Sequence, residues 1–239
     1  MSPIGPSPLA SLFPCLVATA EFAFGTEDVE LWPQETSAVM DAVPKRRREF
    51  AAGRLCARSA FVQLGYPPVA IPCGTDRAPV WPNELVGSIT HCESFAAAAV
   101  AWAQDYRALG IDVELEGAVP QSLSSVLFSR EELDHMCALP TGRQDWRTLF
   151  FSAKEAVYKA VFPLTRQFLD AQAVRIYVHP EFERFEALIL AGPMRSLRLP
   201  GRYLHKQSRV HTVSWLENLR SSSTGNLTSC FAANCTVPR

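Results

Sequence analysis

The chain has 239 residues, of which 48% are hydrophobic, so it can form one large domain or two small ones around a buried core. Its formal net charge of −1 gives no overall electrostatic case for binding nucleic acid or an anionic membrane, so any anion site must be local. The seven cysteines, at positions 15, 56, 73, 92, 137, 230 and 235, lack the close pairing of zinc sites, which favours free thiols in a reducing compartment.

The first twenty residues do not resemble a targeting or membrane segment. Residues 1–8 contain three prolines and no Lys or Arg, so the apolar run over residues 9–20 lacks the basic flank of a secretory signal. Pro14 interrupts that run, which is also too short to span a bilayer. We therefore expect a cytoplasmic protein that does not bind a membrane.

The first half of the chain predicts a strand, two helices and a second strand. Residues 15–24 alternate loosely and end at Gly25, which predicts a strand, and Pro33 opens a short helix toward Val43. Apolar residues recur at helical spacing over residues 45–64, which predicts a helix with one buried face. Further elements are a Pro-rich and Gly-rich loop at 66–83 with a possible short strand at 80–81, a strand end at 88–91, and an alanine-rich stretch at 95–102 whose propensity favours helix.

The first turn of the 45–64 helix is strongly basic. It carries Lys45, Arg46, Arg47 and Arg48, and Arg54 and Arg58 follow. Such a run is compatible with a solvated helix end, with a nucleic-acid or localisation patch, or with a phosphate site, because helix N-termini attract anions.

The second half predicts two helices and four strands. Ser129-Arg130-Glu131-Glu132 has the form of a capping box that begins a helix ending near Leu139. Residues 146–162 predict a second long helix that ends at Pro163. The strands are expected at residues 174–178, 185–190, 202–206 and 210–216, and the Ser-rich, Thr-rich and Asn-rich residues 218–239 predict a disordered tail.

Two short stretches carry the candidate chemistry. In the first, GIDVE at residues 110–114, the carboxylates of Asp112 and Glu114 alternate with apolar residues, so a strand would place both on one face. In the second, FSAKEAVYK at residues 151–159, Glu155 and Lys159 stand four apart and share one helix surface.

If this strand packs on this helix, three carboxylates and a lysine converge. Like charges at close range raise one another's pKa, whereas a hard divalent cation removes the repulsion. Magnesium prefers such oxygen ligands and leaves room for substrate phosphates, so Asp112, Glu114 and Glu155 form a candidate magnesium site. The alternative is an exposed Glu155–Lys159 helix pair worth about 0.2–0.5 kcal/mol beside a solvated strand face.

The two stretches resemble the paired signatures of the 4'-phosphopantetheinyl transferases, in particular the larger surfactin and enterobactin type. GIDVE has the form of the family's G-[IV]-D-x-E and FSAKEAVYK that of its [WF]-x-x-K-E-[AS]-x-x-K. Similar stretches lie upstream, RREFAAGR at 47–54, RAPVWP at 77–82 and GSITHC at 87–92, so the resemblance covers roughly residues 10–217.

The resemblance implies an α+β fold, a pseudo-dimer of two similar α/β halves with the active site in the cleft between them. It places a coenzyme A-binding half at residues 1–108 and a magnesium-binding, catalytic half at 109–217. It also implies a strand at 95–102, against helix propensity, and a monomer, because one chain completes the cleft.

The implied reaction moves the 4'-phosphopantetheine arm of coenzyme A to a serine of an acyl or peptidyl carrier protein and releases adenosine 3',5'-bisphosphate. The resemblance assigns catalysis to Asp112, Glu155 and Lys159. It assigns coenzyme A binding to Asp112 and Lys159 together with Arg48, Arg54, Arg77, Thr90, His91 and Lys154. Glu93 departs from the family pattern, because it puts an acid near the expected phosphate site. The upstream stretches point to secondary metabolism, including polyketide, nonribosomal-peptide or siderophore synthesis.

Two other functions are compatible with single features. A magnesium-dependent phosphohydrolase or nuclease could use the same three carboxylates without a protein acceptor. A nucleic-acid-binding protein would explain the basic run at 45–48, but the net charge of −1 disfavours it.

Overall fold

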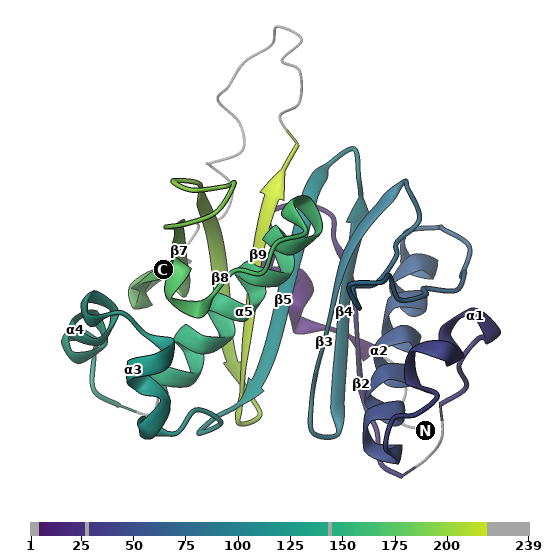
Figure 1. Cartoon of the computed structure of the whole chain (residues 1–239), viewed down its shortest axis with the longest axis horizontal. Helices are drawn as coiled ribbons and strands as arrows, with labels where there is room; N and C mark the ends of the chain where they lie inside the picture. Colours follow the sequence, from purple (N-terminus) through teal and green to yellow (C-terminus); the bar gives the residue numbers. More distant parts are fainter. Residues whose placement is uncertain (1–4, 27–28, 143–144, 219–239) are drawn as a thin grey trace, which may run out of the picture.

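The computed structural model describes residues 5–26, 29–142 and 145–218, and within them the chain forms two antiparallel sheets, each with one long helix (Figure 1). The predicted tail at 218–239 lies outside these residues except for Asn218. The first sheet has the order β1 (Gly5–Pro6), β2 (Ala18–Ala23), β4 (Phe95–Trp102), β3 (Leu85–Cys92). The second has the order β5 (Tyr106–Leu115), β9 (Arg209–Glu217), β8 (Arg198–Lys206), β7 (Arg184–Ile189), β6 (Val174–His179).

The two long helices are α2 (Pro44–Gln63) and α5 (Trp146–Thr165). The shorter α-helices are α1 (Pro33–Thr36), α3 (Ser124–Leu127) and α4 (Arg130–Ala138). The 3-10 turns are η1 (Pro8–Leu12), η2 (Ser37–Val39), η3 (Gln121–Leu123), η4 (Ala171–Ala173) and η5 (Pro180–Phe182). Helix α4 begins with the predicted capping box, in which Ser129 accepts from the Glu132 backbone and Glu132 accepts from the Ser129 backbone.

Three apolar clusters hold these layers together. One lies between α2 and the first sheet, and another between α5 and the second sheet. A third, the central core, joins the opposite faces of both sheets and is covered by η1. The chain is therefore an α+β protein in which two halves repeat one arrangement, a long helix on an antiparallel sheet.

The halves meet where β3 lies beside β5 (Figure 1). These two strands are not ladder partners, but the Ile111 backbone N–H donates to Ser88 Oγ over 3.1 Å. Helix α5 crosses β5 closely, because a Cβ on Gly110 would lie 1.8 Å from the Ala156 carbonyl oxygen. The strand carrying GIDVE thus contacts both the other half and the helix carrying Glu155.

Residues 95–102 form strand β4, so the helix favoured by alanine propensity is wrong and the strand implied by the resemblance is confirmed. The reason is burial on both faces. Ala96 and Ala98 belong to the cluster under α2, whereas Ala97 and Ala99 belong to the central core. Small side chains let two layers approach this strand, and such tertiary packing overrides intrinsic propensity.

Several expected elements differ from the structure, and β8 begins at Arg198 rather than at residue 202. Helix α5 continues through Pro163 and ends at Thr165, where Arg166 takes a left-handed conformation with φ of 54°. Pro163 therefore lies inside the helix, and only two helical residues follow it. The helix expected over residues 33–43 is reduced to α1 and η2, and Val80-Trp81 is not a strand. Only an isolated bridge between Cys73 and Pro79 closes that loop.

Candidate active site

The carboxylates of GIDVE lie on the face of β5 that meets α5. Ile111 and Val113 are fully buried in the central core, so the alternation of the strand turns Asp112 and Glu114 to the opposite face. Asp112 is only 3% exposed. The predicted orientation of this strand is confirmed.

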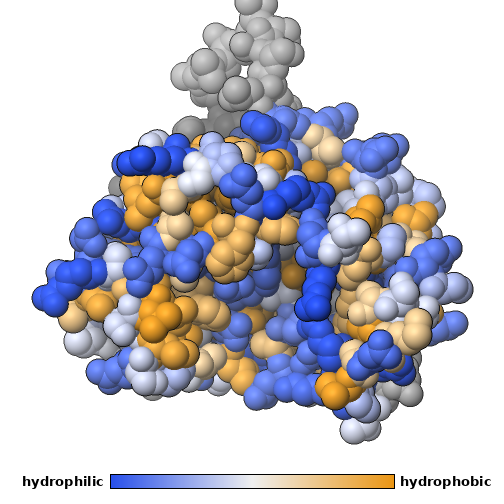
Figure 2. Space-filling model, in the orientation of Figure 1, coloured by the Kyte–Doolittle hydropathy of each residue, from blue (hydrophilic) through white to orange (hydrophobic). Residues whose placement is uncertain are grey.

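Lys159 links the three elements that meet at this point. Its Nζ donates to Asp112 Oδ1 over 2.6 Å and to Thr90 Oγ1 over 3.1 Å. Thr90 in turn donates to the same Asp112 oxygen over 3.0 Å. One residue from β3, one from β5 and one from α5 therefore form a closed cluster at the junction of the halves. The face of the molecule in Figure 2 is hollowed in its middle, with hydrophilic side chains gathered beside the hollow.

The two other carboxylates, those of Glu114 and Glu155, have raised pKa values. Burial, followed by the charges of Asp112 and Glu155, raises the pKa of Glu114 to about 7, although Lys159 opposes this shift. Burial and then Asp112 raise the pKa of Glu155, again against Lys159. One lysine is too little positive charge for three acids, so the cluster favours an added cation.

The donor set fits magnesium. The second oxygen of Asp112, Oδ2, is buried and has no hydrogen-bond partner, and the nearby acids supply the oxygen ligands that magnesium prefers. Within the described ranges, however, no group of three or more His, Cys, Asp or Glu side chains is gathered as a metal cluster. Asp112, Glu114 and Glu155 thus interact electrostatically without forming a closed ligand set, and Lys159 Nζ donates to Asp112 Oδ1.

His91 belongs to a second group of polar residues, at the start of α2. Its Nε2 lies 2.6 Å from the Arg46 guanidinium, and its Nδ1 lies 3.6 Å from Glu49 Oε2. Burial, and next the charge of Arg46, lower the pKa of His91. The basic run of α2 therefore meets the predicted histidine, through Arg46.

Arg48 lines a surface hollow of about 290 Å³ near the same helix end. Lys45 and Glu93 also line it, so the unexpected acid faces the same space as two cations. Glu93 occupies the turn between β3 and β4 with φ of 45°. Its position is explained by this turn, and nothing in the structure assigns its carboxylate a chemical task.

Three predicted coenzyme A contacts lie away from the Asp112–Lys159 cluster. Lys154 is 3% exposed, and its Nζ donates to Glu132 and to the carbonyls of Ala171 and Val174. Because an ammonium has three N–H groups, none remains for a phosphate. The structure therefore contradicts a cofactor contact for Lys154 and gives it a structural role.

Arg54 is buried too, with Nε donating to the Ile71 carbonyl over 2.8 Å and its guanidinium over the Phe50 ring. It supports the loop that carries Arg77 and contacts none of the other predicted phosphate-binding side chains in the described part of the chain. Arg77 itself is exposed at a tight turn with φ of 66°. Asp76 beside it pairs with Arg166 of the other half over 2.5 Å.

Sequence reasoning missed Arg46 and Glu49 as site residues. Both lie in the basic run, and their spacing of three gave a usable signal of a shared helix face. The sequence did not show that this face turns toward His91.

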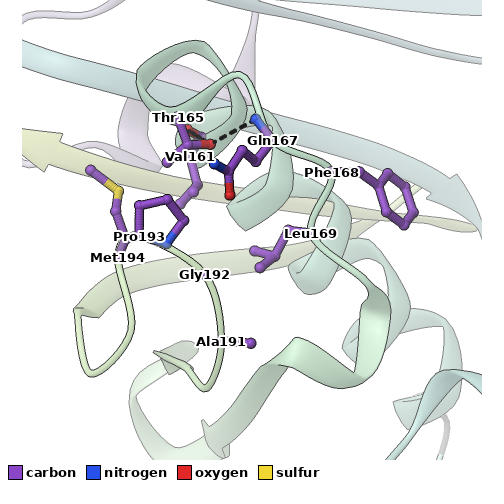
Figure 3. A pocket seen from close by; sticks show the side chains of 9 residues that line it. All are labelled: Val161, Thr165, Gln167, Phe168, Leu169, Ala191, Gly192, Pro193 and Met194. Carbon is purple, nitrogen blue, oxygen red and sulfur yellow. Dashed lines mark hydrogen bonds between the residues drawn. The ribbon is translucent and has the colours of Figure 1, made fainter.

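A small pocket of about 20 Å³ at the end of α5 is separate from this site (Figure 3). It is lined mainly by apolar residues such as Val161, Leu169 and Met194. Phe168 projects away from the other lining side chains and is 78% exposed. No titratable side chain lines it, so it does not carry the chemistry.

The sequence matches two family models. Residues 34–101 match the 4'-phosphopantetheinyl transferase N-terminal domain, and residues 108–211 match the 4'-phosphopantetheinyl transferase superfamily. The first stretch includes α2 and β3, and the second includes β5 and α5, so the matches cover every element of the site.

Of three curated relatives compared with this chain, two are named 4'-phosphopantetheinyl transferases. The chain is 43% identical to 4'-phosphopantetheinyl transferase Svp of Streptomyces mobaraensis over 167 residues, which cover 69% of this chain and 68% of the relative. It is 36% identical to 4'-phosphopantetheinyl transferase PptT of Mycobacterium tuberculosis, over 70% of this chain and 76% of the relative. It is 33% identical to enterobactin synthase component D of Escherichia coli, over 65% and 77%.

None of the helices in the described ranges is long and apolar enough to cross a membrane. The matched domains, the two-sheet α+β fold and the identity to these relatives agree with the resemblance of the two signature stretches. The chain therefore belongs to the 4'-phosphopantetheinyl transferase superfamily and is an enzyme of that class.

Proposed function

We propose that this enzyme transfers the 4'-phosphopantetheine arm of coenzyme A to a serine of an acyl or peptidyl carrier protein and releases adenosine 3',5'-bisphosphate. The observation that carries this proposal is the cluster of Lys159, Thr90 and Asp112 at the junction of the two halves. It joins residues from both matched domains and lies beside two acids with raised pKa values, Glu114 and Glu155.

Asp112, Glu114 and Glu155 would hold magnesium, which would supply positive charge at the pyrophosphate of coenzyme A. Lys159 is already within 2.6 Å of Asp112 and can shift to stabilise the charge that develops on the departing phosphate. Near the α2 N-terminus, Arg46 and Arg48 offer N–H donors for the 3'-phosphate, and His91 lies against Arg46.

In the transfer, the serine Oγ forms a bond to the phosphorus of the phosphopantetheine arm. The bond from that phosphorus to the oxygen of the bisphosphate leaving group breaks, and the electron pair stays with the leaving group. Glu155, whose pKa is raised toward the working range of a general base, accepts the serine proton directly or through water. Residues 1–108 would supply coenzyme A binding and residues 109–217 the acids and Lys159.

The cleft needs no second chain, so we expect a monomer. The carrier would come from fatty-acid, polyketide or nonribosomal-peptide synthesis, and we favour secondary metabolism, including siderophore synthesis, because one relative is named an enterobactin synthase component. A magnesium-dependent phosphohydrolase remains chemically compatible with the acids, but it explains neither family match.

The test is intact mass spectrometry of an apo carrier protein incubated with the enzyme, coenzyme A and magnesium, with an EDTA control. We expect the carrier to gain one phosphopantetheine and EDTA to prevent the gain. A gain that EDTA does not affect would contradict the metal assignment. Absence of the gain with carriers of all three classes, together with hydrolysis of coenzyme A, would contradict the transferase proposal.

A further inference from the structure

Helix α2 packs closely on β3 at one point, and this contact places an acid against the predicted histidine. A Cβ on Gly53 would lie 2.6 Å from Ile89 Cγ2, so only a glycine lets the helix approach so near. Glu49 precedes Gly53 by one turn on the same helix face, and His91 follows Ile89 by two residues on the same strand face. Glu49 therefore faces His91.

The Glu49 carboxylate lies among three cationic or basic groups. Its Oε2 is 3.6 Å from His91 Nδ1 and 3.8 Å from the Arg46 guanidinium, and its Oε1 is 3.9 Å from Lys45 Nζ. The Glu49 side chain is 10% exposed, whereas that of Arg46 is 52% exposed. The acid is thus the inner member of the group, and the cations face the solvent.

These contacts fix the orientation of the imidazole. An arginine nitrogen can only donate a hydrogen bond, so His91 Nε2 accepts from Arg46 over 2.6 Å and the ring proton lies on Nδ1. That proton points toward Glu49. The Glu49 carboxylate and the Arg46 guanidinium thus flank the two ring nitrogens of His91, and the guanidinium keeps its other N–H groups for a ligand.

A buried acid beside a phosphate site repels the ligand, so Glu49 needs a structural role that compensates for this repulsion. Charge compensation of the basic run does not require burial, because Lys45 and Arg46 reach solvent on their own. Orientation does require burial, because only a carboxylate on the inner side attracts both the imidazole and the guanidinium from that side.

We propose that Glu49 is a positioning residue that, together with His91, holds Arg46 for the 3'-phosphate of coenzyme A. This inference rests on the proposed function and deepens it. Glu49 does not touch the ligand; it acts through Arg46, whose remaining N–H groups are available to the phosphate. Its loss should weaken recognition of the 3'-phosphate and leave the binding of the rest of coenzyme A intact.

The test compares two ligands that differ only in that group. Calorimetry with coenzyme A and with 3'-dephospho-coenzyme A should show that the wild-type enzyme prefers the former. Glu49→Gln removes the charge at constant shape, and we expect it to bind coenzyme A about 3- to 5-fold more weakly, the effect of one partly exposed ion pair. Its affinity for 3'-dephospho-coenzyme A should change by less than about twofold.

Two variants and a control make this reading specific. His91→Gln should show the same selective loss, and the double variant should lose little more, because the two residues act as a unit. The matched control is Glu131→Gln. It removes an exposed acid of α4 that pairs with Arg175 of β6, and it should leave both affinities unchanged. If Glu49→Gln does not fold by circular dichroism, Glu49→Asp keeps the charge but withdraws it and should show the same ligand selectivity.

Equal weakening for both ligands, or no weakening for either, would overturn the positioning role. If the wild-type enzyme bound both ligands equally well, the assignment of Arg46 to the 3'-phosphate would itself be overturned. These outcomes are separate from failure of the proposed function, in which the wild-type enzyme shows the expected ligand preference but transfers nothing to any carrier.

Discussion

At the scale of single residues, Lys159 is central to the site. Its ammonium contacts Asp112 and Thr90, and its charge opposes the rise in the pKa values of Glu114 and Glu155. We expect Lys159→Ala to lower kcat about 10²- to 10³-fold, as the loss of one preorganised charge does elsewhere, and to change the KM for coenzyme A much less. Steady-state kinetics with a carrier protein measures both. A change confined to KM would mean that Lys159 binds coenzyme A without stabilising the transition state.

His211 provides a residue-scale test of how burial affects stability. Burial, followed by the charges of Arg209 and Lys206, lowers its pKa to about 4. Between about pH 4 and the ordinary value of 6.5, the folded protein thus binds fewer protons at this site than the unfolded chain, so stability falls as the pH falls through this window.

His211→Gln should remove up to about 3 kcal/mol of this pH dependence. The measurement is urea unfolding of the wild type and the variant from pH 7 to pH 4. Glu21, whose raised pKa acts in the opposite direction, lies 3.9 Å from His211, so Glu21→Gln is introduced into both proteins to remove its contribution. Parallel curves for the two proteins would contradict the assignment.

At the scale of elements, the contact between β5 and α5 sets the geometry of the acids. Gly110→Ala would place a Cβ 1.8 Å from a backbone oxygen of α5, which cannot move without the helix. We expect a loss of about 3 kcal/mol in the free energy of unfolding, at the upper end for overpacking, together with reduced transfer because Glu155 and Lys159 move. Gly142→Ala, where nothing lies within 4 Å, is the control. Wild-type stability and activity for Gly110→Ala would contradict the packing described.

The ion pair of Lys154 and Glu132 joins α5 to α4, and both side chains are buried. Lys154→Met should cost about 3–5 kcal/mol, because it leaves the Glu132 carboxylate buried without its charge partner. The double variant with Glu132→Gln should be less destabilised than the sum of the single variants, as for residues that share one network. Chemical denaturation of the four proteins measures this coupling, and strictly additive losses would contradict it.

Much of the element structure follows from the sequence. The helix at α2, the capping box of α4 and the strands β6 to β8 have the expected periodicity and caps, because each of these strands presents one buried face. Strand β4 does not, since a strand buried on both faces loses the period-two signal and its alanines then resemble a helix. The end of α5 is set by the Arg166 conformation, which local sequence did not predict.

At the scale of the whole molecule, the site exists because two halves meet at β3 and β5. Spacing alone predicted that Asp112 and Glu114 share a strand face and that Glu155 and Lys159 share a helix face. It did not predict that Asp112 and Lys159 hydrogen-bond Thr90 of the other half, nor that Arg46 and Glu49 of α2 meet His91. Such contacts join residues 22 to 69 positions apart, and pattern rules act only over a few residues.

The most direct test of the central claim is the mass of an apo carrier protein after incubation with coenzyme A, magnesium and each of three enzymes: wild type, Asp112→Asn and Glu155→Gln. The acids at the junction are proposed to hold the metal and accept the serine proton. We therefore expect one added phosphopantetheine with the wild type and almost none with either variant, although both variants remain folded by circular dichroism. Full modification of the carrier by either folded variant would contradict the account.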